Sequence, residues 1–455
     1  MRHAPHDTRL GQLQRGRGAG FLAALAQPAA ARDEVLGCVL EDPRIDAQIE
    51  ARGAYYAELA HRIDVDVAPM VRRAAAADGW LAVDVLVELA ARGHSVATNL
   101  LTCPEREPEA ATAVLKDLVA HGEWAVSHLE LPAAAFLAEQ LDAADELVHA
   151  VEIDGEFWNR WRSALWRVER AFVDAAAQAA VAAALAPEPV RDLDALATED
   201  LILRAQYGQS GWKRARQVLE RRDSELEREV LADVVTHAHE GSSAVIAART
   251  LGSFGDLRLL ASAEATFART DLDFSGTANA IERQRRAALL HYVKALPPAT
   301  VLPLARRWWP RGGYLRVAAG AVLRRHAEAV DREWLEEVVA RTLGPACDRV
   351  INEIEALRRI GDVRTLPVLI RVAEQSTYSF ARGNALLGVA AHAQEAQARI
   401  ALHEALWDSE DVAVELACTH ADLRPVGSRA RIAEIVAAPL VPPEVHLAAL
   451  SRALA

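Results

Sequence analysis

A twelve-residue stretch near the middle of the chain has the residue types and spacing of a calcium-binding loop. Its oxygen-bearing side chains belong to Asp271, Asp273, Ser275, Thr277 and Glu282. Calcium takes about six to eight hard oxygen ligands, and this spacing wraps them around one point while Gly276 permits the sharp turn. The chemistry expected of this stretch is therefore Ca²⁺ binding, with Glu282 as a bidentate ligand.

The stretch resembles the loop of an EF-hand, and helical segments are expected on both sides of it. It departs from that pattern at Ala278, where EF-hands have a larger aliphatic residue, and it lacks a partner hand. The alternative is a longer loop between two helices, in which Ser275 or Thr277 caps the helix that follows. Both interpretations, the calcium loop and the capped loop, remain open from the sequence.

Residues 283–327 are a second candidate site, because these 45 residues contain ten Lys or Arg and no Asp or Glu. The candidate partner-binding residues in this basic segment are Arg285, Arg286, Arg306, Arg307, Trp308, Trp309, Arg311, Arg316, Arg324 and Arg325. Arginines interleaved with aromatic residues suit an acidic protein partner, and also phosphate contact with base stacking. In a third interpretation neighbouring helices supply carboxylates, for example Glu333, Glu336, Glu337, Glu353 and Glu355.

The composition narrows the classes of partner and compartment. The net charge of −13 repels polyanions at long range, which argues against nucleic-acid binding over the whole surface but not against a local basic patch. The four cysteines are far apart and form no CxxC pair, so we expect small buried residues in a reducing compartment. The apolar runs are too short and Ala-rich to span a bilayer, and Phe21–Ala26 is expected to be a helix of the mature protein. These features predict a cytoplasmic protein.

Small residues recur at regular intervals in the second half of the chain. From about Ser224 onward, apolar residues follow a helical spacing in blocks separated by Gly, Pro or Asp. Alanines mark successive blocks at Ala247-Ala248, Ala287-Ala288, Ala318-Ala319, Ala356, Ala385 and Ala417. Their intervals of 29 to 40 residues match a repeat of two helices, in which small residues allow neighbouring inner helices to meet closely.

Two turns repeat one pattern 106 residues apart, at 251–258 and 357–364. In each, we expect the glycine, Gly255 or Gly361, to end a helix in a left-handed conformation and the following Asp to cap the next helix. Pro367 is expected in the first turn of that next helix, where its missing N–H is harmless, and Pro303 is expected in an equivalent position.

These turns and alanines resemble HEAT repeats, including the PBS-lyase type, over roughly residues 224–455. The resemblance implies an all-α fold of the armadillo-like helical superfamily: an α-solenoid of antiparallel helix pairs whose inner helices line a concave groove. It implies binding through that groove and not any particular activity, since such arrays serve many tasks.

The first part of the chain is also expected to be helical, but less regular. A long helix is predicted from Glu156 to about Leu185, with Trp158, Trp161, Leu165, Val168 and Phe172 on one stripe. Prolines then break the chain. We therefore predict an irregular α-helical N-terminal region over 1–188, a helical connector over 189–223 and the repeat array over 224–455.

From these observations we expect a non-catalytic scaffold that binds a protein partner through its concave face and the basic segment. The alternative is a nucleic-acid-associated HEAT-like protein, including a DNA-glycosylase-like enzyme, that uses Arg306, Arg307, Trp308, Trp309 and Arg311. The sequence contains no HExxH or GxSxG motif and no convincing Cys/His pair to which a reaction can be assigned.

Overall fold

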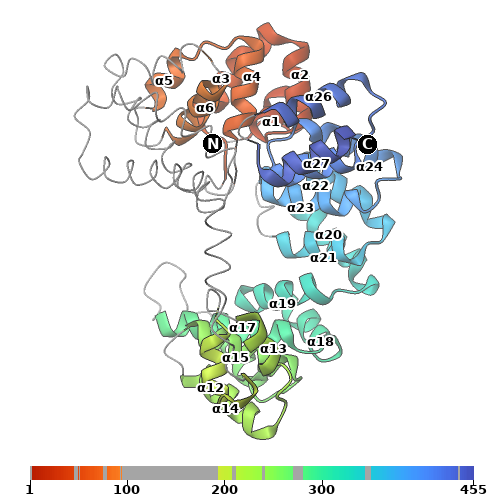
Figure 1. The fold of residues 1–455 in the computed structure, drawn as a ribbon. Helices are drawn as coiled ribbons and strands as arrows, with labels where there is room; N and C mark the ends of the chain where they lie inside the picture. Colours follow the sequence, from red (N-terminus) through yellow and green to blue (C-terminus); the bar gives the residue numbers. More distant parts are fainter. Residues whose placement is uncertain are drawn as a thin grey trace, which may run out of the picture. The chain divides into compact units, whose positions relative to one another are not determined.

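The structure is a computed structural model that describes residues 3–45, 50, 52–74, 79–92, 94, 193–206, 212–237, 241–269, 280–343, 350–438 and 441–454. These residues form 22 α-helices and several short 3-10 turns, with no strand among them. The predicted all-α class is therefore confirmed, and it follows from a composition rich in the strong helix formers Ala and Leu. The chain divides into two compact units (Figure 1).

The first unit combines the N-terminal and C-terminal parts of the chain: Met1–Ala180, Glu336–Ile351 and Gly361–Ala455. Its described N-terminal helices are α1 (Arg9–Gln14), α2 (Gly18–Ala26), α3 (Pro28–Glu41), α4 (Gly53–Ile63), α5 (Ala68–Ala74) and α6 (Trp80–Ala91). Its C-terminal helices are α22 (Leu366–Gln375), α23 (Ser379–Ala390), α24 (Ala396–Glu404), the 3-10 turn η7 (Ala405–Trp407), α25 (Asp411–His420), α26 (Val426–Ala437) and α27 (Pro443–Leu454).

Aromatic side chains hold the N-terminal helices of the first unit together. The ring of Tyr55 lies edge-on to Phe21 and to Tyr56, with centroids 5.6 and 5.1 Å apart, and all three side chains are buried. Each tyrosine hydroxyl donates to a backbone carbonyl, Tyr55 to Arg17 and Tyr56 to Leu13, at 2.8 Å in both cases. The hydroxyls are thus satisfied inside an apolar cluster, which fixes the loop between α1 and α2 against α4.

The second unit comprises Val181–Leu335 and Asn352–Ile360. Its α-helices are α12 (Thr198–Arg204), α13 (Trp212–Leu219), α14 (Glu225–His237), α15 (Gly241–Ser253), α16 (Leu260–Ala268), α17 (Ala280–Ala295), α18 (Pro298–Trp308), α19 (Gly313–His326) and α21 (Ile351–Ile360). Its 3-10 turns include η3 (Trp309–Arg311) and η4 (Ala329–Asp331). Helix α20 (Arg332–Thr342) is divided in sequence between the second unit, up to Leu335, and the first unit, from Glu336.

The alanines singled out in the sequence lie between packed helices. All of them are fully buried except Ala287, which faces solvent. A close approach of two of these helices occurs at Gly252 of α15, where an added Cβ would lie 2.4 Å from the carbonyl oxygen of Tyr292 in α17. The backbones of α15 and α17 therefore touch at their C-terminal ends, and only glycine fits this position.

Both glycines are left-handed as predicted, with φ of +71° at Gly255 and +67° at Gly361. Asp362 caps the 3-10 turn η6 (Val363–Thr365) that precedes α22, whereas the prediction that Asp256 caps the next helix is wrong, because α16 begins at Leu260 after Leu259 and has no side-chain cap. In both turns, the following Asp accepts hydrogen bonds from the backbone N–H and the Nε of the Arg two residues later. Among the described residues the same Asp-X-Arg turn occurs four times, at Asp256–Arg258, Asp362–Arg364, Asp42–Arg44 and Asp422–Arg424. The chain thus reuses one turn in both units.

The prediction for Pro303 is wrong. Pro367 does lie in the first turn of α22, but Pro303 lies inside α18, which begins five residues earlier with Pro298 in its first turn. Pro298 provides the favourable helix start, so the helix continues through Pro303 despite the hydrogen bond that this residue cannot donate.

Candidate partner-binding surface

Two cations of the basic segment bond to side chains of neighbouring elements in the second unit. Arg306 of α18 donates to Asp331, with Nε 2.7 Å from Oδ1, and to Glu328 at 3.1 Å. Burial opposes ionisation of Asp331, but the hydrogen bonds from Arg306 and the backbone outweigh it and hold the pKa of this carboxyl below its usual value. At the start of α17, Arg285 donates to the hydroxyl of Ser262 at 3.2 Å.

Glu264 of α16 accepts hydrogen bonds from three further residues of the basic segment. Its Oε1 accepts from the indole N–H of Trp308 at 3.0 Å, from Arg307 at 3.4 Å and from Arg311 at 3.5 Å. Trp308 is 0% exposed, so its ring is part of the core. The side chains of Arg307 and Arg311 remain about half exposed, but one carboxylate already offsets part of their charge.

Other arginines of the segment cover its aromatic rings. The guanidinium of Arg316 lies 4.5 Å from the ring centre of Trp309, which in turn lies 5.4 Å from Trp334. Arg286 lies 4.5 Å from the ring centre of Tyr314. These cation–π contacts are internal to the unit, and they occupy faces on which a base or a partner side chain would stack.

Positively charged and imidazole side chains collect where the C-terminal ends of α15, α17 and α19 lie side by side. We call this surface the basic row; its members are Arg249, His291, Lys294, Arg324, Arg325 and His326. The Nε2 atom of His326 lies 3.2 Å from the carbonyl oxygen of Lys294, which places the end of α19 against the end of α17. Cations are also favoured here because helix C-termini carry partial negative charge.

The cations of the basic row lie close enough to affect one another. Burial and then the charges of Arg324, Arg325 and Arg249 lower the pKa of Lys294, while Glu355 partly offsets them. Glu355 pairs with Arg324, but no described carboxylate lies within ion-pair distance of Arg249, Lys294 or Arg325. Three cations of the row, one on each of three helices that lie side by side, therefore have no ion-pair partner among the described residues.

Burial also lowers the pKa of both histidines in the basic row. For His291 the charges of Lys294 and Arg249 add to the effect of burial. For His326, a hydrogen bond to the Lys294 carbonyl opposes burial, and Arg325 and Arg359 add to the lowering. Both imidazoles are thus biased towards the neutral form, and an anion placed on the row would reverse that bias.

The structure brings together only part of the predicted partner-binding set. Arg324 and Arg325 belong to the basic row, whereas the predicted residues of α18 and η3 lie around Glu264, Asp331 and Glu328. Sequence reasoning left Arg249, His291, Lys294 and His326 out of the site. The signal that could have found them is a basic residue near the end of each helix marked by alanines.

The calcium prediction cannot be followed in the structure, because Asp271, Asp273, Ser275 and Thr277 lie outside the described residues. Glu282 is described, and its Oε1 pairs with Nη1 of Arg269 at 3.1 Å. Within the described ranges no three His, Cys, Asp or Glu side chains are grouped so that they could hold a metal ion.

The tryptophan stripe predicted at 158–172 also lies outside these ranges. Two of the four cysteines, Cys38 and Cys418, are described, and both are free and buried as expected.

In the first unit, the loop between α1 and α2 is fixed to the C-terminal helices. Nη2 of Arg17 lies 2.8 Å from Oε1 of Glu404, and its Nη1 donates to the backbone carbonyl of Glu374 at 3.1 Å. The backbone N–H of Ser409 donates to the carbonyl of Gly16 at 2.9 Å. Segments almost 400 residues apart in sequence therefore form one polar interface.

Two buried ion pairs continue this interface. Arg52 and Glu50 are both fully buried and 2.5 Å apart, and Glu50 also accepts from the backbone N–H of Ser379 at 3.1 Å. Arg382 pairs with Asp408 at 2.8 Å, again with almost no exposure of either side chain. Charges desolvated to this degree are tolerated only when paired. Arg52 and Glu50 come from one segment, and the bond from Ser379 to Glu50 joins that segment to α23, while the second pair joins α23 to the residue that follows η7.

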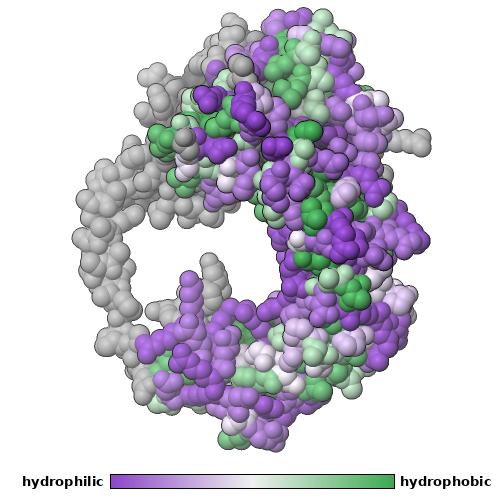
Figure 2. Space-filling model, turned by 90° about the vertical axis from the view of Figure 1, so that its right-hand side faces the viewer, coloured by the Kyte–Doolittle hydropathy of each residue, from purple (hydrophilic) through white to green (hydrophobic). Residues whose placement is uncertain are grey.

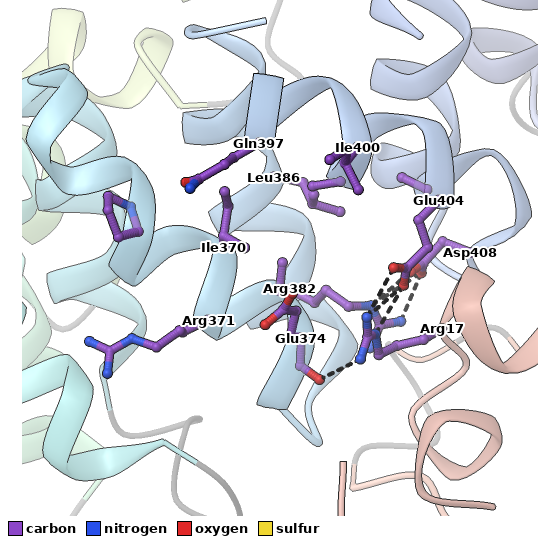
Figure 3. A pocket seen from close by; sticks show the side chains of 14 residues that line it. Arg17, Ile370, Arg371, Glu374, Arg382, Leu386, Gln397, Ile400, Glu404 and Asp408 are labelled. Atoms are coloured by element: carbon purple, nitrogen blue, oxygen red, sulfur yellow. Dashed lines mark hydrogen bonds and ion pairs between the residues drawn. The ribbon is translucent and has the colours of Figure 1, made fainter. Parts of the chain in front are cut away.

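Beside this interface the first unit has a groove of about 450 Å³ that runs between α22 and α24 over α23 (Figure 3). Its apolar lining consists of Pro367, Ile370, Ala373, Leu386, Ile400, Ala401 and Ala405. At one end lie the ion pairs Arg17–Glu404 and Arg382–Asp408. Ile400 is 70% exposed, which is unusual for a large aliphatic side chain, and the groove volume is in the range of ligand-binding clefts.

No described helix is both long and apolar enough to cross a membrane. On the face seen in Figure 2 hydrophilic residues predominate, and hydrophobic residues form separate patches. Comparison with family models, with curated proteins and with solved structures finds no match to this chain.

Proposed function

We propose that the protein is a cytoplasmic, non-catalytic helical-repeat scaffold that binds an acidic protein partner through the basic row. The repeat architecture, a HEAT-like α-solenoid, is supported by the recurring Asp-X-Arg turn, by the left-handed glycines before two of its copies, and by buried alanines between successive helices. In such arrays each repeat buries its neighbour's face, and the row of inner helices is left to bind partners.

The observation that carries the proposal is that Arg249, Lys294 and Arg325, on three neighbouring helix ends, have no described carboxylate within ion-pair distance. Cations held together without carboxylates repel one another, and an acidic partner would relieve this repulsion. Neighbouring helix axes in proteins lie about 8–10 Å apart, so the row offers regularly spaced contacts to a partner that crosses all three helices.

A protein partner fits this site better than nucleic acid does. Trp308 is buried and one face of Trp309 is covered by Arg316, so neither ring is freely open to stack on bases. The net charge of −13 would also oppose long-range attraction of a polyanion.

The test measures binding of a fluorescein-labelled oligoglutamate peptide and of single-stranded DNA to the full chain by fluorescence anisotropy. The row variant Arg249→Gln/Lys294→Gln/Arg325→Gln removes three charges, and Arg204→Gln/Arg221→Gln/Arg399→Gln removes three exposed charges elsewhere. We expect the row variant to bind the peptide at least about tenfold more weakly, because partly desolvated cross-interface charges contribute of order 1 kcal/mol each. We expect the control variant to keep the affinity.

Two results would overturn the proposal. Equal weakening by both triple variants would mean that the peptide senses only total charge. Tighter binding of DNA than of the peptide, with a steep loss of affinity as salt rises, would assign the row to nucleic acid instead.

A further inference from the structure

The three cations of the basic row that have no described carboxylate partner are arranged around Lys294. Helix α17 packs against both α15 and α19, which makes its Lys294 the central member, between Arg249 of α15 and Arg325 of α19. Lys294 is half-buried, whereas Arg249 and Arg325 are exposed, and both arginines lie close enough to lower the pKa of Lys294. A ligand that reaches Lys294 therefore meets one cation from each of three helices.

A single side-chain carboxylate matches this arrangement poorly. It carries one negative charge and two oxygens, and a second carboxylate brought beside it would be repelled by the first. A phosphate monoester carries about −1.5 to −2 charge at neutral pH on one group, with three acceptor oxygens. Lysine and arginine each offer several N–H donors, so one phosphate can accept hydrogen bonds from all three cations at once.

We infer that the group recognised by the basic row is a phosphorylated serine or threonine of the partner protein, held by Arg249, Lys294 and Arg325. The inference rests on the function proposed above, and it narrows the partner from an acidic protein to a phosphorylated one. The phosphate lies over Lys294 and accepts hydrogen bonds from the arginine on each side. Arginine clusters recognise phosphorylated peptides in other folds in the same way. Phosphorylation of the partner then controls whether it binds.

Glu355 of α21 limits how many cations the phosphate can use. This buried carboxylate pairs with Arg324, which is the neighbour of Arg325 on α19, and it opposes the lowering of the Lys294 pKa. Replacing Glu355 by Gln leaves Arg324 without this partner and adds a fourth cation to the site. The variant should therefore bind a phosphorylated peptide more tightly, a gain that the loss of a merely structural contact would not give.

The test compares three fluorescein-labelled peptides of one neutral background by fluorescence anisotropy on the full chain. One contains a phosphoserine, the second contains two adjacent glutamates of about the same total charge, and the third contains an unmodified serine. We expect the phosphoserine peptide to bind at least about tenfold more tightly than the diglutamate peptide, because it makes at least one more hydrogen bond to a charged donor. The serine peptide should bind most weakly of the three.

Variants of the chain locate the phosphate. Arg249→Gln/Lys294→Gln/Arg325→Gln should abolish the preference for phosphoserine, and the control Arg204→Gln/Arg221→Gln/Arg399→Gln should keep it. Glu355→Gln should tighten phosphoserine binding by about threefold or more, which is the usual contribution of one added partly exposed charge. Circular dichroism melting checks that each variant is folded.

The outcomes separate this inference from the function on which it rests. Equal affinity for the phosphoserine and diglutamate peptides overturns the phosphate inference but leaves an acidic partner standing, whereas failure of both peptides and of oligoglutamate to bind overturns both. A preference for phosphoserine that survives in the row variant, or an affinity that Glu355→Gln leaves unchanged or weakens, also overturns the inference. Tighter binding of single-stranded DNA than of the phosphoserine peptide would assign the site to nucleic-acid phosphates instead.

Discussion

The carboxyl group of Glu353 in α21 should make the second unit less stable at alkaline than at acidic pH. Glu353 is 2% exposed, and its Oε2 has no hydrogen-bond partner. Burial raises the pKa of Glu353 to about 7. A hydrogen bond from its own backbone N–H and the positive charge of Arg316 both favour the charged form, but their effect on the pKa is smaller than that of burial. The folded unit therefore holds the proton more tightly than the unfolded chain does.

The size of the effect follows from the shift. The ordinary value is 4.5, and each pKa unit corresponds to about 1.4 kcal/mol, so the shift represents roughly 3 kcal/mol. The stabilisation is complete below pH 4.5, decreases as the pH rises from there through about 7, and is absent at pH 8. Replacing Glu353 by Gln removes the titrating group while keeping its shape.

We therefore expect Glu353→Gln to be within about 1 kcal/mol of the unaltered protein at pH 5 and to be more stable by up to about 3 kcal/mol at pH 8. Urea unfolding followed by circular dichroism at pH 5, 6.5 and 8 measures the difference. Glu333→Gln is the matched control, since the side chain of Glu333 is 86% exposed and should give no pH-dependent difference. A constant gap between Glu353→Gln and the unaltered protein across this pH range would refute the reasoning.

Three further predictions follow from close contacts and shifted groups. In thermal melting, Gly252→Ala should lower the free energy of unfolding by at least about 2 kcal/mol, because the added Cβ would meet the Tyr292 carbonyl. The control is Gly37→Ala, whose Cβ would point into open space within α3, and it should be neutral or stabilising. Arg382→Met should cost about 3–5 kcal/mol by leaving Asp408 buried and unpaired, and Arg382→Met/Asp408→Leu should recover most of that loss in urea unfolding. Oligoglutamate binding to the basic row should tighten as the pH falls from about 7.5 to 6, because the bound peptide raises the lowered pKa values of His291 and His326, so that binding takes up protons. Calorimetry in two buffers of different ionisation enthalpy measures this proton uptake, with His291→Gln/His326→Gln as the control. If the unaltered protein takes up no protons on binding, the histidines are not involved.

Local features of the fold could be predicted from the sequence because their causes are local. Gly255 and Gly361 have left-handed φ values that few other residues adopt, and the alanines mark close contacts because only small side chains fit between adjacent helices. Pro303 shows the limit of this reasoning. The same Leu-Pro pair opens α22 at Pro367, but in α18 an earlier proline already starts the helix, and the position of a helix start depends on the whole segment.

The candidate site was only partly predictable, because charge compensation is a property of three-dimensional neighbours. The basic segment contains no acid, yet Glu264 lies before it in sequence and Asp331 after it, and together they bind most of the α18 and η3 cations. The basic row takes one residue from α15, two from α17 and three from α19. Periodicity places those residues at helix ends, but it does not indicate which ends become neighbours.

The joining of residues 9–63 to residues 366–420 in one unit has a consequence for how the protein is made. Arg17 meets Glu404 only after 387 further residues have been added, which takes on the order of 20–80 s at ordinary rates of translation. Until then Arg52 and Glu50 lack the α22–α23 segment that covers them. The N-terminal helices leave the ribosome first, and the surface with which they later contact α22–α23 stays exposed during that time. We expect chaperones to bind the nascent chain during that interval, and release from them to coincide with the emergence of α22 through α25.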